Sequence, residues 1–287
     1  MKFVKRRLFL KAAVMTFGSV AVAAEPKQSN DNSLTLVVMD PLAAPLSCPC
    51  VKGYAQRDYA KLAKYLEAKL GKPVKVFFGE SLVNTLAKKS NGKADIIIGK
   101  ESVVEFEAKE AKLATVPVAA LTGKDGKTTQ TGLIVVAASD AALTASDLTG
   151  YRVIFGEASA AEKHSAALAL FKDLGVEMPS KIETCVACTD GATKVVDAGR
   201  KGEKLATVIS SYAQPLLEGC GTIQKGDLKV VGETDPVPFI VAFANAKLPE
   251  ALRTEIQTAL IGIVKEPELL TALETKAGFV SQPGKKK

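Results

Sequence analysis

Short apolar segments alternate with amphipathic segments along this chain, and the series runs through twice. Residues 34–39, 74–78 and 94–98 are apolar enough for buried strands, whereas 54–70 and 102–112 carry apolar residues at helical spacing. Repeated strand–helix alternation is typical of α/β folds with mostly parallel sheets. The pattern restarts near residue 147, so the sequence predicts two lobes with a cleft near the carboxyl ends of their strands.

The first 24 residues are interpreted as an export signal rather than as part of the fold. A basic cluster at 5–11 precedes an uncharged, mostly apolar run at 12–24, and Ala-Val-Ala at 21–23 resembles a cleavage site. The run is too short to span a membrane, which takes about 20 apolar residues. The paired Arg6 and Arg7 favour the twin-arginine route. We therefore expect a periplasmic protein that is soluble after signal cleavage.

Much of the positive charge belongs to the two ends of the chain. Five basic residues and no acidic ones lie in the first 24, and subtracting them from the whole-chain charge of +7 leaves +2. Residues 25–33 are interpreted as a flexible tether and 281–287 as a basic tail. A nearly neutral body lacks the electrostatic footprint of a nucleic-acid-binding protein. The predicted partner is a small-molecule ligand, and the chain is expected to be a monomer.

Several motifs mark the predicted lobes. Lys93–Gly99 places an aspartate before an apolar strand, Ala145–Gly156 opens the second series, and Asp235–Pro238 precedes a returning strand. In their order and spacing these motifs resemble the periplasmic substrate-binding proteins of phosphonate, phosphite and phosphate ABC importers. The resemblance implies the type 2 periplasmic binding protein fold, with two lobes that are joined by two crossing strands and close on a ligand.

The same resemblance sets the lobe boundaries and the activity. It places residues 34–131 plus 240–280 in the first lobe and residues 132–239 in the second. It implies a protein without catalytic activity that passes its ligand to an ABC permease in the inner membrane. No Ser/His/Asp arrangement, Walker loop or Rossmann glycine pattern occurs, so an enzyme would need the cysteines to carry its chemistry.

The segment after Gly156 departs from the family pattern. The family carries a Ser/Thr-rich turn there, whose hydroxyls and backbone N–H groups hold an oxyanion at a helix start. Here the segment keeps one serine, Ser159, and gains the carboxylates Glu157 and Glu162, which would repel a dianionic phosphonate. The ligand is therefore expected to be an oxyanion or a metal complex of unknown identity.

The candidate ligand-binding residues share a position at a predicted strand end or helix start that faces the cleft. They are Tyr54, Gln56, Arg57, Lys100, Ser159, His164, Thr189, Asp190, Ser211 and Tyr212.

The five cysteines leave two hypotheses open. Cys48 and Cys50 follow the first strand, and Cys185 and Cys188 follow a strand of the second lobe. In an exported protein such cysteines commonly form disulfides, here Cys185–Cys188 or a bridge between the two loops. Alternatively, these four thiols with His164 form a copper or zinc site, or carry thiol-redox chemistry on the same scaffold. No cofactor is certain.

Overall fold

A computed structural model describes residues 32–47 and 55–282, and these form two α/β lobes. The predicted signal, residues 25–31 of the predicted tether, Cys48, Cys50, Tyr54 and residues 283–287 lie outside the described residues. No helix within the described ranges combines the length and the apolar character needed to cross a membrane.

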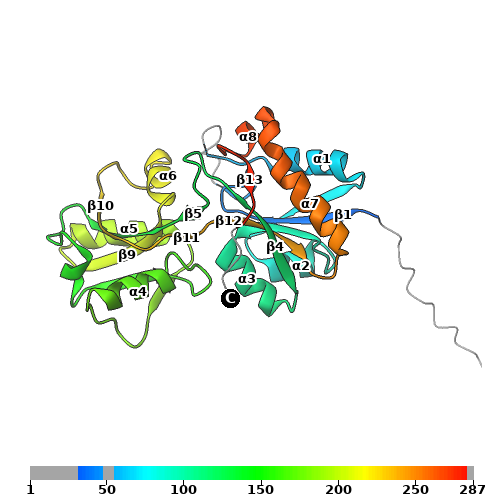
Figure 1. The fold of residues 1–287 in the computed structure, drawn as a ribbon. Helices are drawn as coiled ribbons and strands as arrows, with labels where there is room; N and C mark the ends of the chain where they lie inside the picture. Colours follow the sequence, from blue (N-terminus) through cyan, green and yellow to red (C-terminus); the bar gives the residue numbers. More distant parts are fainter. Residues whose placement is uncertain (1–31, 48–54, 283–287) are drawn as a thin grey trace, which may run out of the picture. The chain divides into compact units, whose positions relative to one another are not determined.

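The first lobe is built on a six-stranded mixed sheet (Figure 1). Its strands, in order across the sheet, are β13 (Phe279–Val280), β4 (Thr115–Leu121), β12 (Ile240–Asn245), β3 (Ile96–Lys100), β1 (Leu34–Met39) and β2 (Val74–Phe78). One face packs against α1 (Tyr59–Leu70), α7 (Glu250–Gly262) and α8 (Pro267–Ala272). The other face packs against α2 (Leu82–Lys88) and α3 (Glu101–Glu110). A 3-10 turn, η3 (Ile263–Lys265), follows α7.

The second lobe is built on a five-stranded mixed sheet. Its strands, in order across the sheet, are β10 (Leu228–Glu233), β6 (Gly132–Ala137), β9 (Leu205–Ser210), β7 (Arg152–Gly156) and β8 (Glu183–Cys185). One face packs against α4 (Ser165–Asp173), and the other packs against α5 (Cys188–Arg200) and α6 (Ala213–Gly219). A 3-10 turn, η2 (Ala145–Leu148), precedes β7.

Two short strands lie where the chain passes between the sheets. β5 (Thr129–Gln130) leads from β4 to β6, β11 (Val237–Pro238) leads from β10 back to β12, and the two pair antiparallel (Figure 1). Because β12 returns to the first sheet, it pairs antiparallel with both β3 and β4. The sequence predicted mostly parallel sheets, whereas both sheets are mixed. The first is mixed because of β12, and the second because β6 pairs antiparallel with β9 and β10.

Two predicted helices begin later than their apolar spacing indicated. Helix α1 begins at Tyr59 rather than at residue 54, because the Asp58 side chain accepts the N–H groups of Ala60 and Lys61 and caps the helix there. Helix α4 begins at Ser165 rather than near residue 160. Residues 161–164 form turns instead, and one of them supplies the buried Glu162.

Candidate functional site

A cleft of about 530 Å³ is lined by residues of both lobes. The first lobe contributes residues that follow β1 or flank the β3–α3 junction, including Leu42, Lys100 and Val103. The second lobe contributes the segment after β7, the start of α5 and helix α6, including Ser159, Cys188 and Leu216. The strands β1, β3, β7 and β9 all point their carboxyl ends at this region, as expected for a ligand site in α/β sheets.

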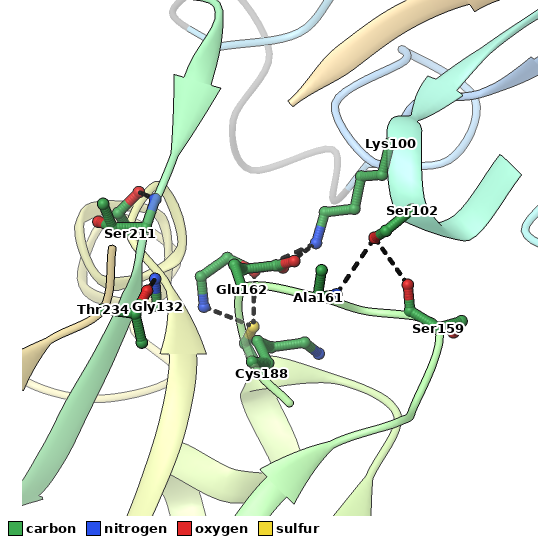
Figure 2. Close-up of polar contacts among 12 residues, drawn as sticks. Lys100, Ser102, Gly132, Ser159, Ala161, Glu162, Cys188, Ser211 and Thr234 are labelled. Carbon is green, nitrogen blue, oxygen red and sulfur yellow. Dashed lines mark hydrogen bonds and ion pairs between the residues drawn. The ribbon is translucent and has the colours of Figure 1, made fainter. Parts of the chain in front are cut away.

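Glu162 and Lys100 form an ion pair between the two lobes (Figure 2). Lys100 ends β3, and Glu162 lies on the turn before α4 with a side chain that is fully buried. The Ser210 hydroxyl, at the end of β9, donates to Glu162 Oε1 at 2.7 Å and accepts from Lys100 Nζ at 3.2 Å. Side chains from two strand ends and from the turn before α4 therefore meet beside the cleft.

Ser102 makes a second connection between the lobes. Its hydroxyl donates to the carbonyl oxygen of Ser159 at 2.7 Å and accepts the N–H of Ala161 at 3.1 Å (Figure 2). Ser102 lies in the first turn of α3, two residues after Lys100. The segment 159–162 of the second lobe is thus held against the first lobe by side chains of the protein itself.

The ion pair keeps both of its members charged. Burial by itself lowers the pKa of Lys100, but Tyr212, Glu162 and Cys188 around the ammonium outweigh it, and the net pKa lies above the ordinary value. Burial raises the pKa of Glu162, but the attraction of Lys100 and hydrogen bonds from Lys100 and Ser210 outweigh it and lower the net pKa. Lys100 is therefore protonated and Glu162 ionised at neutral pH.

Arg57 lies in the interior rather than at the cleft. Its Nη1 donates to Asp40 Oδ2 at 2.8 Å, and both side chains are almost completely buried. Its guanidinium also lies 5.4 Å from the ring of Phe239, which stacks on Tyr212 with ring centroids 5.2 Å apart. The charge of Arg57 is already paired with Asp40 at the end of β1, and a role for Arg57 in ligand binding stays a prediction.

The structure brings some of the other predicted residues together at the cleft. Lys100, Ser159, Thr189 and Tyr212 line it, and a role in ligand binding stays a prediction for each. Gln56 Nε2 donates to the carbonyl oxygen of Ala44 at 3.4 Å.

Five of the predicted residues that the structure describes are absent from the lining of the cleft, namely Gln56, Arg57, His164, Asp190 and Ser211. His164 precedes α4 and bonds through Nδ1 to the Gly156 carbonyl oxygen at 2.8 Å. The Ser211 hydroxyl accepts the N–H of Thr131 at 3.2 Å, just before β6. Asp190 is exposed in the first turn of α5.

The cysteines do not form the disulfides that were predicted for the second lobe. Cys185 and Cys188 are free thiols, whereas Cys220 is disulfide-bonded. Cys188 lines the cleft, and its Sγ accepts the backbone N–H of Ser210 at 3.4 Å. Within the part of the chain that the structure describes, no three His, Cys, Asp or Glu side chains group so as to hold a metal ion. The four-cysteine hypothesis includes two positions outside that part.

Titration with DTNB tests whether Cys185 and Cys188 are free thiols in solution. Burial raises the pKa of the Cys185 thiol, so little thiolate forms at neutral pH and its reaction should be slow and should accelerate as pH rises. Changing Cys185 and Cys188 together to serine should lower the number of reactive thiols of the native protein by two. An unchanged count would show that the two cysteines are bridged in solution.

Sequence reasoning missed Glu162 and Ser102 as parts of this site. Glu162 was noted only as a charge that repels anions, and no motif indicates that it reaches Lys100, 62 residues away. The available signal was a charged residue, Glu162, among alanines. A carboxylate in such an apolar segment is buried only where a cation pairs with it.

Comparison with known proteins identifies the family. The sequence model of the family described as "ABC transporter, phosphonate, periplasmic substrate-binding protein" matches residues 53–282. The chain therefore belongs to the family of periplasmic substrate-binding proteins of phosphonate ABC transporters, as its motifs predicted. No curated protein matches the sequence significantly.

Solved structures show the same fold at low sequence identity. PhnD1 of Prochlorococcus marinus, in complex with methylphosphonate, is similar with a TM-score of 0.64 and 12% identity, over 90% of this chain and 95% of that chain. A protein of Xanthomonas citri bound to ATP is similar with a TM-score of 0.64 and 13% identity, over 88% of this chain and 92% of that chain. A binding-protein component of an ABC phosphonate transporter from Pseudomonas aeruginosa is similar with a TM-score of 0.62 and 13% identity, over 88% of this chain and 82% of that chain. The two-lobe binding-protein fold is confirmed.

Proposed function

We propose that this protein is exported through a twin-arginine-type leader in residues 1–24, binds a small solute in the cleft between its lobes, and presents it as a monomer to an ABC permease. The observation that carries the proposal is the cleft itself, which is lined from both lobes at the carboxyl ends of their strands. Closing the lobes on a solute that touches both would couple binding to a change of shape that a permease can recognise.

The lining supports a solute with an apolar body rather than a small dianion alone. Leu42, Leu46, Val103, Leu216 and Leu217 supply much of the wall. Three carboxylates also line it, those of Glu80, Glu107 and Glu157, and they oppose a second negative charge on the ligand. A relative that binds methylphosphonate makes an organophosphonate the first ligand class to test, with a substituent larger than a methyl group.

The polar cluster at the cleft supports binding rather than catalysis. Ser210 Oγ lies 3.2 Å from Lys100 Nζ, a distance at which a neutral lysine can activate a serine. The raised pKa of Lys100 keeps its ammonium protonated, so it has no lone pair with which to accept the serine proton.

A single tryptophan tests whether the cleft is the binding site. The chain contains no tryptophan, and the exposed Ala187 lines the cleft. An A187W side chain should fill part of the cleft, so native mass spectrometry of protein from the periplasm should show at least tenfold less co-purified solute than for wild type. A169W is the matched control, since Ala169 is exposed on α4 and is not among the residues that line the cleft. Equal occupancy in both variants would contradict the proposal.

Thiol chemistry is the second candidate function. It is favoured by one observation, the free thiol of Cys188 on the wall of the cleft, three residues after the free thiol of Cys185. Elemental analysis for copper and zinc tests the metal-binding form of this candidate. Metal that is present in the wild-type protein and lost when both cysteines are changed to serine would support it over simple solute binding.

A further inference from the structure

The cations that line the cleft are already paired with acceptors of the protein itself. Lys100 Nζ bonds to Glu162 and Ser210, and Lys163 Nζ donates to the Val186 carbonyl oxygen at 3.0 Å. Both lysines are buried residues. Of these two lysines only Lys100 is neutralised by a carboxylate, because the Val186 carbonyl that Lys163 contacts is uncharged. An anion that approaches Lys100 therefore competes with Glu162.

The carboxylate of Glu162 makes the contacts that a bound anion would make. It accepts a charge-assisted hydrogen bond from a buried ammonium and a second hydrogen bond from a hydroxyl at a strand end. These are the contacts by which proteins hold carboxylates and phosphates in closed sites. They also come from both lobes, as the contacts to a ligand in a closing cleft must.

Glu162 is not fully satisfied in this position. Its Oε2 is buried and accepts no hydrogen bond from any residue that the structure describes. A buried carboxylate oxygen without a donor loses its hydration without compensation, which offsets part of the gain from the ion pair. The carboxylate is therefore held firmly enough to occupy the position, yet a ligand with better-matched oxygens can compete for it.

We propose that Glu162 is an internal occupant of the anion position beside Lys100 and Ser210, so that an anion binds there only by displacing it. The inference rests on the proposed function, and it adds that the cleft selects anions with an apolar body over small oxyanions. Small oxyanions such as free phosphate bring too few other contacts to displace Glu162. A ligand whose apolar body also packs on the leucines of the cleft gains enough additional binding energy to do so.

The test is the affinity of inorganic phosphate for E162Q, measured by isothermal titration calorimetry at fixed pH and ionic strength. Glutamine keeps the shape of the side chain and its carbonyl acceptor but removes the charge, so Lys100 becomes available to phosphate. We expect phosphate to bind E162Q at least tenfold more tightly than wild type. Affinity within twofold of wild type, or no detectable binding to E162Q, would overturn the proposal.

Two further variants separate the local effect from a general change of charge. E177Q removes the same charge from an exposed residue that is not among those lining the cleft, and it should leave phosphate affinity within twofold of wild type. The double variant K100Q/E162Q should lose whatever E162Q gained. A gain of equal size in E177Q, or one that survives in the double variant, would also overturn the proposal.

Folding and the proposed function are controlled separately. Circular dichroism and thermal unfolding establish that each variant is folded. If E162Q is not, E162D takes its place, because the shorter carboxylate keeps its charge but withdraws from Lys100 and should give a smaller gain in the same direction. The phosphate titration needs no knowledge of the natural solute, so its failure is distinct from a failure of the A187W experiment.

Discussion

Replacing Asp40 by alanine is expected to lower the free energy of unfolding by about 3–5 kcal/mol. Asp40 is fully buried at the end of β1, where Oδ2 accepts Arg57 Nη1 at 2.8 Å and the Tyr59 hydroxyl at 2.5 Å. Oδ1 accepts the backbone N–H of Leu42 at 2.9 Å. Alanine leaves all three donors without an acceptor, and one of them carries a full charge in the interior.

The guanidinium of Arg57 loses its carboxylate partner in this variant. Its Nε is already buried without a hydrogen-bond partner among the described residues, and its face lies on the ring of Phe239. Desolvation of an unpaired buried charge costs several kcal/mol. Removing one member of a buried ion pair therefore destabilises a protein much more than replacing both members by apolar residues. The stacking of Phe239 on Tyr212 connects this pair to the wall of the cleft.

The measurement is guanidinium chloride unfolding followed by circular dichroism, with E183A as the matched control. Glu183 pairs with Arg152 through two hydrogen bonds of 2.6 Å, a closer ion pair than that of Asp40. The side chains of Arg152 and Glu183 are both substantially exposed, so E183A should lower the free energy of unfolding by no more than about 1 kcal/mol. A D40A loss no larger than that of E183A would show that burial does not decide the strength of the Asp40 pair.

The alternation of apolar segments predicted the lobes because it records a local requirement. A strand buried on both faces needs consecutive apolar residues, and a helix on a sheet needs an apolar stripe at helical spacing. Both requirements can be read within a single window of the chain. The later start of α4 could not be read in this way, because the alanines at 160 and 161 suit a helix equally well. The contacts of Ala161 and Glu162 with the other lobe decide against it.

The contrast between Arg57 and Lys100 shows why the site was harder to predict than the fold. Lys100 is a cation at the end of β3 and Arg57 is one just before α1, and the sequence made both candidate ligands of an anion. Arg57 is paired with a carboxylate 17 residues earlier and Lys100 with one 62 residues later. Sequence spacing shows neither ion pair, because each pair forms only when the fold places a distant segment of the chain beside the cation. Composition gave only the number of charges, whereas the site depends on which of them remain unpaired.

Replacing Gly132 by alanine is expected to lower the free energy of unfolding by about 3 kcal/mol, at the upper end of the usual cost of overpacking. Gly132 begins β6 directly after the crossing strand β5. A Cβ at this position would lie 2.0 Å from the carbonyl oxygen of Glu162 and 3.0 Å from its carbonyl carbon. These are backbone atoms, so no change of rotamer can relieve the overlap, and either the start of β6 or the turn at Glu162 must move.

The control for this variant is G123A, measured by the same unfolding experiment. The Cβ of an alanine at 123 would meet Oδ1 of Asp125 at 2.8 Å, the far end of an exposed side chain that can swing aside. Its cost should therefore be a few tenths of a kcal/mol. Equal losses in G132A and G123A would show that the turn at Glu162 is free to shift. A large loss confined to G132A would show that the backbone of β6 holds Glu162 in place, since the substitution removes no side-chain contact of the ion pair itself.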